Sequence, residues 1–330
     1  MRLKPRIPDT RTMVRRAARH GSALLTALGV ALSVGLVALL ALTLGATPVP
    51  ARAAGAPHDA AHDDRGRVLA SAQAPRRIIS LLPSLTEAVC ALGDCERLVG
   101  VDRYSDFPAR VQGLPRLGGL DDAQVERIVA LKPDLVLASP SARVIERLEG
   151  LGLRVLALEA NDLGATHRVL QAVALALGRP GEGERLWQGL DRQIQVAAAR
   201  VPTGWRGRKV YFEVATTPYA AGESSFIGEL LARLGLGNIV PAKLGPFPQL
   251  NPEFIVRAQP AVVMADAESL RGMAARPGWG AIKALQQQRA CGFAPGEYEL
   301  LVRPGPRLGE AAAALADCLG RLAPPEAAAP

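Results

Sequence analysis

The chain contains few of the side chains that enzymes use for catalysis. Of its four histidines, only His167 lies in the part of the sequence expected to fold, so a Ser–His–acid triad or a histidine-rich metal site lacks material. No Gly-x-Gly-x-x-Gly motif follows a predicted strand, and no phosphate-binding loop occurs. We therefore expect a protein that is not an enzyme, with no catalytic residues, no resident cofactor and no metal site.

The expected folded part also lacks an excess of charge of one sign. The formal net charge is +8, but residues 1–53 hold eight of the 39 Lys and Arg side chains and only one of the 31 acids, Asp9. The remainder therefore carries 31 basic and 30 acidic residues. It shows no basic stripe with interleaved aromatic residues, so we expect no nucleic-acid partner.

The N-terminus is organised as an export signal. A basic start is followed by an apolar run over about residues 23–46 and then by Ala51-Arg52-Ala53, an A-x-A cleavage pattern. The run is also long enough to span a bilayer, which takes ~20 residues. We predict that residues 1–53 are a cleaved signal peptide of a periplasmic protein, with a retained inner-membrane anchor as the alternative. No other membrane contact is expected.

Four cysteines remain in the body of a chain that we expect to meet an oxidising compartment. Cys90 and Cys95 flank Gly93, a predicted helix end, and such a turn brings two Cα atoms within disulfide distance. Cys291 and Cys318 would join the last strand to the last helix. The alternative is unpaired, buried thiols, and no Cys-x-x-Cys redox or zinc motif occurs.

One segment of the sequence occurs twice. Residues 126–138 are echoed by residues 253–265, with Glu, Ile-Val, Pro, Val and Ala in register. Each copy predicts a short helix, a proline break and a strand buried on both faces. The repeat therefore predicts two similar lobes with a ligand held between them.

The order of predicted elements gives the domain organisation. Strands alternate with helices over residues 76–162 and again over residues 206–322, which is typical of parallel sheets. Residues 163–205 contain only helical patterns, so we predict an α/β fold of two Rossmann-like lobes joined by a long, rigid helical connector. Residues 54–75 are expected to be a disordered linker and residues 323–330 a frayed tail.

Ligands of parallel sheets bind beyond the carboxyl ends of the strands. Ser84 follows the first strand and is expected to cap the next helix, with Glu87 completing a capping box. Tyr104 and Tyr219 occupy equivalent strand-end loops, where they suit a large, flat ligand. Phe247 lies in a loop that two prolines stiffen. The alternative for both tyrosines is ordinary partial burial.

Glu126 and Glu253 occupy the same position in the two copies of the repeat. As acids in the first turn of a helix, both would be favourably placed against the macrodipole, and this alone would explain them. A functional alternative is a pair of carboxylates that engages basic residues on a two-fold symmetric partner.

Four segments of the chain, at residues 79–87, 104–108, 126–136 and 246–249, carry a resemblance to a known family. They read Ile-Ser-Leu-x-Pro-Ser-x-Thr-Glu, Tyr-Ser-Asp-Phe-Pro, Glu-Arg-Ile-Val-Ala-Leu-Lys-Pro-Asp-Leu-Val and Pro-Phe-Pro-Gln. The chain thereby resembles the substrate-binding proteins of ABC importers for cobalamin, haem and ferric siderophores, and the cobalamin-binding members most. The resemblance covers about residues 76–322.

The resemblance implies a helical-backbone, class III periplasmic binding protein that is monomeric and delivers its ligand to a permease dimer through Glu126 and Glu253. The ligand contacts that it implies are Ser84, Tyr104, Tyr219, Phe247 and Glu299.

The sequence departs from the cobalamin-binding pattern at two pocket tryptophans, which are replaced near Leu120 and Ser139. The expected ligand is cobalamin or another corrinoid, that is, a metal-tetrapyrrole. Haem, with Tyr104 or Tyr219 as its axial ligand, or a ferric siderophore is the alternative. An alternative of another class is an exported α/β enzyme acting in the cleft between the lobes.

Overall fold

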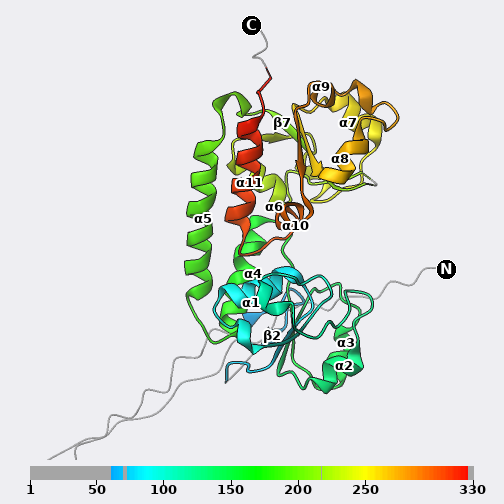
Figure 1. Cartoon of the computed structure of the whole chain (residues 1–330). Helices are drawn as coiled ribbons and strands as arrows, with labels where there is room; N and C mark the ends of the chain where they lie inside the picture. Colours follow the sequence, from blue (N-terminus) through cyan, green and yellow to red (C-terminus); the bar gives the residue numbers. More distant parts are fainter. Residues whose placement is uncertain (1–60, 70–72, 217, 326–330) are drawn as a thin grey trace, which may run out of the picture. The chain divides into compact units, whose positions relative to one another are not determined.

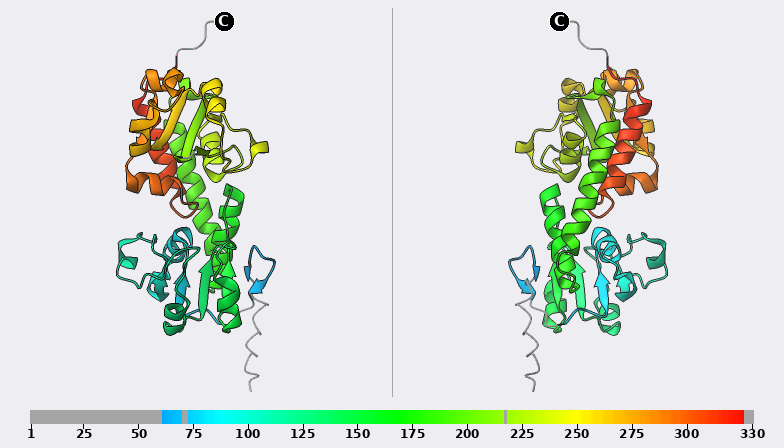
Figure 2. Two further views of the ribbon diagram at one scale, coloured as in Figure 1. Left: turned by 90° about the vertical axis from the view of Figure 1, so that its right-hand side faces the viewer. Right: turned by 90° about the vertical axis from the view of Figure 1, so that its left-hand side faces the viewer.

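The computed structural model of the chain describes residues 61–69, 73–216 and 218–325. The predicted signal peptide or anchor at 1–53, the start of the predicted linker and the last residues of the tail lie outside these ranges. The described residues belong to one compact unit, and its ribbon is drawn in Figures 1 and 2. Among the described residues, no helix has both the length and the apolar character needed to cross a bilayer.

The N-terminal lobe is built on a four-stranded parallel sheet with the order β4-β3-β5-β6. Helix α1 covers one face of the sheet, and α2 and α3 cover the other, so that apolar cores form on both sides. The elements are β3 (Ile78–Ser80), α1 (Pro83–Ala91), β4 (Leu98–Val101), α2 (Val125–Ala130), β5 (Leu135–Ala138), α3 (Ile145–Gly150) and β6 (Val155–Ala157).

The C-terminal lobe repeats this plan with parallel strands in the order β11-β10-β7-β9, and β8 pairs antiparallel with the end of β7. The strands are β7 (Lys209–Ala215), β8 (Tyr219–Ala220), β9 (Gly237–Asn238), β10 (Val262–Asp266) and β11 (Ala290–Phe293). The helices are α6 (Phe226–Arg233), α7 (Pro252–Ala258), α8 (Ala267–Met273), α9 (Lys283–Gln286), α10 (Pro295–Leu301) and α11 (Leu308–Arg321). Single 3₁₀ turns occupy Cys95–Arg97, Ala109–Val111, Thr203–Trp205, Ala242–Leu244 and Trp279–Ala281.

The repeat in the sequence corresponds to a repeat in the structure. Helix α2 leads into β5 and helix α7 leads into β10, and both strands lie between two parallel neighbours. Strands in these central positions are buried on both faces, which is why both copies carry a continuous apolar run. The prediction of two related α/β lobes is confirmed.

Two helices join the lobes, as predicted. Helix α4 (Leu163–Ala176) is followed by α5 (Glu182–Arg200), whose 19 residues span ~28 Å. Leu190 of α5 packs into the core of the N-terminal lobe, whereas Ile194, one turn later, packs into that of the C-terminal lobe. Helix α11 (red) lies along α5 (green) in Figure 1, and Figure 2 shows α5 running past both lobes. The connector is therefore a rigid strut rather than a pair of extended strands.

The expectation of a disordered linker over 54–75 is wrong for residues 61–69. These residues form an antiparallel hairpin of β1 (Ala61–His62) and β2 (Val68–Leu69). Its Asp64 backbone N–H donates to the Ala157 carbonyl of β6, and its carboxylate accepts from Arg168 of α4 at 2.6 Å. Contacts with residues so distant in the sequence leave no local pattern, so composition alone could not reveal them.

The expected capping box at Ser84 is also wrong. Helix α1 begins at Pro83, and its N-cap residue, Leu82, makes no side-chain capping bond. Proline is favoured at the first helical position because its missing N–H would have no partner there anyway. Ser84 and Glu87 thus lie inside the helix, and Glu87 is free to bind other groups. The predicted end of the helix at Gly93 is confirmed, with a left-handed φ of +87°.

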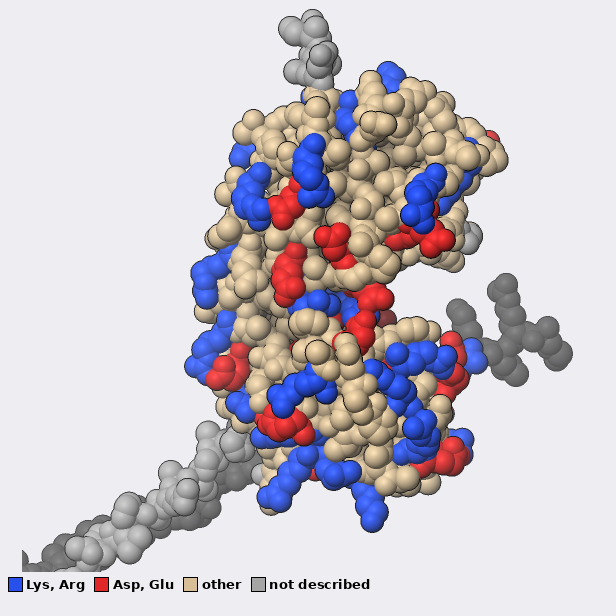
Figure 3. Space-filling model, viewed as in Figure 1, with Lys and Arg blue, Asp and Glu red and all other residues tan. Residues whose placement is uncertain are grey.

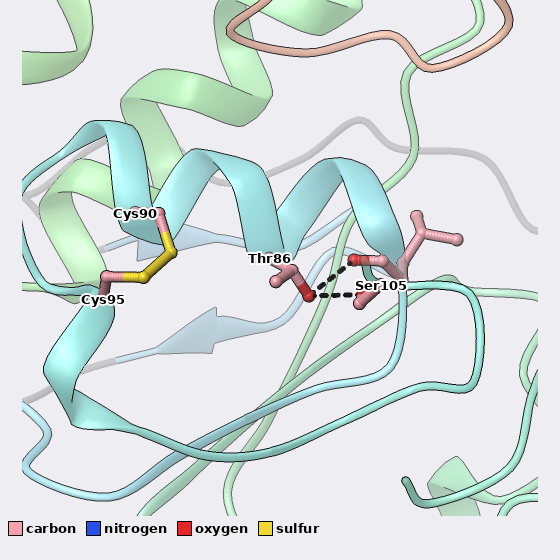
Figure 4. Close-up of a disulfide and its surroundings, with 5 residues drawn as sticks. Thr86, Cys90, Cys95 and Ser105 are labelled. Atoms are coloured by element: carbon pink, nitrogen blue, oxygen red, sulfur yellow. Dashed lines mark hydrogen bonds between the residues drawn. A yellow bond between two sulfur atoms is a disulfide. The ribbon is translucent and has the colours of Figure 1, made fainter. Parts of the chain in front are cut away.

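Both predicted disulfides are present. Cys90 of α1 pairs with Cys95 (Figure 4), and Cys291 of β11 pairs with Cys318 of α11. Their Cα atoms are 4.1 Å and 6.0 Å apart, respectively. The Cys90–Cys95 disulfide closes the loop that follows helix α1. The Cys291–Cys318 disulfide joins β11, the edge strand of the C-terminal lobe, to helix α11, which packs on the connector.

We predict that the two disulfides stabilise the fold unequally. In the chain-entropy relation, the loop of 27 residues between Cys291 and Cys318 corresponds to ~3.5 kcal/mol, and that of 5 residues between Cys90 and Cys95 to ~2 kcal/mol. Urea unfolding of the variants Cys291→Ala/Cys318→Ala and Cys90→Ala/Cys95→Ala measures this difference. If Cys90→Ala/Cys95→Ala lost more unfolding free energy than Cys291→Ala/Cys318→Ala, loop length would not control how much each disulfide stabilises the fold.

Candidate functional site

A cavity of about 340 Å³ lies between the two lobes. Its size falls within the range of ligand pockets. The space-filling view in Figure 3 shows the hollow between the lobes, with acidic side chains of both lobes near its mouth. Its lining residues are Leu82, Pro83, Ser84, Leu85, Leu120, Ser139, Ser141, Leu158, Glu159, Ala160, Asn161, Val169, Phe226, Phe247, Val302, Arg303 and Pro304.

The N-terminal lobe contributes the carboxyl ends of its strands to this cavity. Ser84 follows β3, Ser139 and Ser141 follow β5, and residues 158–161 follow β6. This is the edge at which parallel sheets bind ligands. Ser139 and Leu120, near which the sequence departs from the cobalamin-binding pattern, both line the wall.

The C-terminal lobe contributes an apolar wall. Phe247 and Phe226 meet with their ring centroids 5.9 Å apart, and both line the cavity. The loop that carries Phe247 is fixed because the Gly222 N–H donates to the Pro246 carbonyl at 2.8 Å. A Cβ atom at Gly222 would lie 2.4 Å from the Gly245 carbonyl oxygen, so only glycine permits this close approach.

An arginine of the C-terminal lobe, Arg303, lines the cavity and reaches across to the N-terminal lobe. The terminal nitrogens of Arg303 donate to Asp106 Oδ1 at 2.7 Å, to Glu299 Oε2 at 2.8 Å, to the Tyr104 carbonyl at 3.1 Å and to Glu87 Oε1 at 3.3 Å. Asp106, Tyr104 and Glu87 belong to the N-terminal lobe. The guanidinium is 12% exposed, so little water competes for these bonds.

A second arginine strengthens this junction. Arg307 binds both carboxylate oxygens of Glu87, at 2.9 and 3.1 Å, and its guanidinium carbon lies 4.0 Å from the centroid of the Phe107 ring. Glu87 is almost fully buried, with 2% of its side chain exposed. A carboxylate this deep requires cationic partners, which the segment 303–307 supplies.

The two outer carboxylates around Arg303 differ in acidity. Burial raises the pKa of Glu299 above its ordinary value, and the nearby negative charge of Asp106 adds to that rise despite Arg303. Burial also acts on Asp106, but the hydrogen bond and charge of Arg303 outweigh it and hold the pKa of Asp106 below its ordinary value. Glu299 is thus the first of the two to take up a proton on acidification.

The predicted ligand residues occupy three kinds of position. Ser84 and Phe247 line the cavity. Glu299 lies behind Arg303, as its ion-pair partner. Tyr104 and Tyr219 do not line the cavity; they are 61% and 41% exposed, and each belongs to a segment that adjoins it. Tyr104 binds Arg303 through its carbonyl, and Tyr219 belongs to β8, which bonds to the loop of Phe247.

The loop that carries Tyr104 is fixed against α1. Thr86 Oγ1 and Ser105 Oγ are 2.8 Å apart (Figure 4), and the Asp102 carboxylate accepts from the Tyr104 N–H at 2.8 Å. Burial raises the pKa of Asp102, although the hydrogen bonds from Ser105 and Tyr104 oppose this. The exposed ring is therefore presented from a rigid backbone.

Glu126 and Glu253 lie in the first turns of α2 and α7. The Glu126 side chain is 78% exposed and pairs with Arg147 at 2.7 Å. Glu253 is also exposed, and its backbone N–H donates to the capping side chain of Asn251. Helices α2 and α7 lie on the side of their lobes away from α5 in Figure 1. Both carboxylates are thus accessible on the outer surface, outside the cavity.

His167, the histidine in the part of the chain that was expected to fold, lies on helix α4 of the connector. Its ring is half-buried between α4 and α5, where Nε2 lies 2.7 Å from a Glu184 oxygen and the ring stacks on Trp187. It does not line the cavity. Within the described ranges, no cluster of His, Cys, Asp and Glu is arranged to hold a metal ion.

Sequence reasoning missed Arg303 and Phe226. Glu299, Arg303 and Arg307 follow one another at intervals of four residues, but Arg303 and Arg307 flank a Pro-Gly-Pro loop between α10 and α11. That spacing indicates helical ion pairs, and only the loop directs both arginines to the other lobe. Phe226 follows the helix cap Ser225 and gave no signal besides its apolar character.

We predict that removing the buried carboxylate at the junction is strongly destabilising. Glu87→Ala leaves the largely buried Arg307 side chain without its carboxylate partner and removes one of the four acceptors of Arg303, which should lower the free energy of unfolding by about 3–5 kcal/mol. Denaturant titration measures the loss. Glu182→Ala, which breaks an exposed pair with Arg185, should leave the midpoint nearly unchanged. Equal effects of the two substitutions would contradict the importance assigned to the junction.

Comparison with known proteins places this architecture in a family. The chain is 29% identical over 256 residues to YvrC of Bacillus subtilis, an uncharacterised ABC transporter substrate-binding lipoprotein, covering 74% of this chain and 80% of that protein. It is 27% identical over 259 residues to a vitamin B12-binding protein of Pectobacterium carotovorum, covering 76% of this chain and 90% of that protein.

A solved structure shows the same arrangement of lobes and connector. The periplasmic heme-binding protein RhuT of Roseiflexus sp. RS-1 superposes with a TM-score of 0.64 at 28% identity, covering 74% of this chain and 98% of that one. The fold is that of class III periplasmic binding proteins. The family model for periplasmic binding proteins matches residues 78–291, and the chain belongs to this family.

Proposed function

We propose that this solute-binding protein captures a corrinoid between its lobes and delivers it unaltered to an ABC importer. Family membership supports a small-molecule ligand and a permease partner. The observation that favours a corrinoid is the composition of the cavity wall: among the described residues that line it, none is His, Tyr, Cys or Met. A corrinoid carries its own axial ligands, whereas haem usually takes one from the protein.

The polar groups of the wall suit the amide side chains of a corrin ring. Ser84, Ser139 and Ser141 offer hydroxyl groups that both donate and accept hydrogen bonds, and Asn161 adds an amide. Phe226 and Phe247 supply apolar area on the opposite side. The vitamin B12-binding relative, which aligns over most of its length, supports the same ligand class.

Haem or a ferric siderophore is the alternative ligand of the same fold. Tyr104 and Tyr219, exposed on segments that adjoin the cavity, could serve as axial ligands, and RhuT is a heme-binding protein. An exported enzyme acting in the cleft is the alternative of another class; the matched family consists of binding proteins and does not favour it. Turnover of a candidate substrate, abolished by changing a cleft residue, would support the enzyme instead.

Delivery requires a docking surface on each lobe. We assign this role to Glu126 and Glu253, which would bind arginines on the two permease subunits. Their equivalent positions in the two repeats suit a two-fold symmetric partner. The protein would act as a monomer in the periplasm, with residues 1–53 as a cleaved signal peptide or, alternatively, an inner-membrane anchor.

We predict that calorimetry detects binding of cobalamin or cobinamide, and that Phe247→Ala weakens it by about tenfold or more because the ring provides apolar contact in an enclosed wall. Leu151→Ala removes an exposed side chain at the residue after α3, outside the cavity, and should leave the affinity unchanged. Tighter binding of haem or a ferric siderophore than of either corrinoid would assign the site to the alternative ligand.

We further predict that Glu126→Ala/Glu253→Ala impairs ligand uptake by the intact transport system while leaving the calorimetric affinity unchanged, because both carboxylates lie outside the cavity. The matched control is Glu146→Ala/Glu268→Ala, which removes exposed first-turn acids from the neighbouring helices α3 and α8. If the affinity falls in the first double variant, the pair belongs to the ligand site rather than to docking.

A further inference from the structure

The cavity has a cationic residue in its floor that is not available to an anionic ligand. In the part of the chain that the structure describes, Arg303 is the only Lys or Arg that lines the cavity. Its two terminal nitrogens carry four N–H groups, and the structure provides four acceptors for them: Glu87, Asp106, Glu299 and the Tyr104 carbonyl. A ligand carboxylate could reach these terminal nitrogens only by displacing one of the protein's own acceptors.

The charges around the floor add up to an excess of negative charge. Glu87, Asp106 and Glu299 face Arg303 and Arg307, which leaves one carboxylate in excess. Glu159 also lines the cavity and adds a second. Immediately behind, the carboxylate of Asp102 and the guanidinium of Arg116, which donates to the Asp102 and Ser105 carbonyls, contribute one charge of each sign.

We propose that this arrangement selects for the charge of the ligand: the carboxylates Asp106 and Glu299 occupy Arg303 and thereby reject ligands that present carboxylate groups to the floor. The site then accepts a tetrapyrrole whose side chains are neutral amides and disfavours a ring of similar size with free carboxylates. This inference rests on the proposed function, which supplies the tetrapyrrole ring as the ligand. It adds the chemical class of the groups at the periphery of that ring.

The chemistry explains why the carboxylates, rather than the arginine, control selection. A guanidinium with free N–H groups forms strong bidentate bonds to a carboxylate. Here the same bonds are already made within the protein, and a ligand carboxylate would also meet an uncompensated negative charge. If the ligand carboxylate and one such charge lie ~10 Å apart at an effective dielectric constant of ~20, their repulsion lowers the affinity about tenfold.

Two pairs of probes test the inference, each with one ring and two charge states. Cobinamide and cobyric acid share the corrin ring, but only cobyric acid carries a free carboxylate. Hemin and hemin dimethyl ester share the porphyrin ring, but only hemin carries two free carboxylates. At pH 7.5, calorimetry should show the uncharged periphery bound about tenfold more tightly within each pair. The variant Asp106→Asn/Glu299→Gln should reduce or reverse this preference.

Both substituted side chains are well exposed, at 54% and 44%, so the variant is expected to fold. Asp317→Asn/Glu182→Gln neutralises two carboxylates that pair with arginines on the connector side and should leave both ratios unchanged.

The outcomes separate the two proposals. If only the two porphyrins bind, the corrinoid assignment is overturned. Charge selection is still supported in that case if hemin dimethyl ester binds more tightly than hemin and Asp106→Asn/Glu299→Gln loses this preference. Equal affinity within each pair, or a preference that survives in Asp106→Asn/Glu299→Gln, would overturn charge selection while leaving the corrinoid assignment intact. Failure of all four probes to bind would overturn both.

Discussion

The arrangement of this protein depends on a carboxylate that it buries. Glu87 lies inside helix α1 of the N-terminal lobe, where an unpaired charge would be very costly, and its partners are Arg303 and Arg307 of the C-terminal lobe. The loop between α10 and α11 must therefore cross to the other lobe. Arg303 also lines the cavity. The ion pair that neutralises Glu87 therefore also fixes the position of a residue in the floor of the candidate site.

The lobes are thus joined in two different ways. Helix α5 contributes Leu190 to one core and Ile194 to the other, an apolar and continuous connection along the length of the body. The junction of Glu87 with the arginines is polar and lies beside the cavity. The segments that line the cavity are therefore held in place by both connections.

The local features of the sequence predicted much of this architecture. The repeated helix, proline and buried strand around Glu126 and Glu253 gave the two lobes, and the helical periodicity after residue 163 gave the connector. Gly93 and the cysteine positions gave a helix end and both disulfides. These predictions succeeded because backbone geometry and apolar periodicity depend on neighbours along the chain. The hairpin at 61–69 was missed because its partners, Ala157 and Arg168, are distant in the sequence.

The sequence by itself determined the fold class and the equivalence of the lobes. Its resemblance to a known family implied Ser84 and Phe247 as ligand contacts, and both line the cavity. Only the tertiary structure decided which charged groups meet there. Glu87 had the spacing of a capping box, yet Pro83 starts the helix. Arg303 makes the ion pair with Glu299 that its spacing indicates, but it also reaches Glu87 and Asp106 of the other lobe. The pairing of charges between the lobes depends on how the two lobes pack together, and no local pattern in the sequence records that packing.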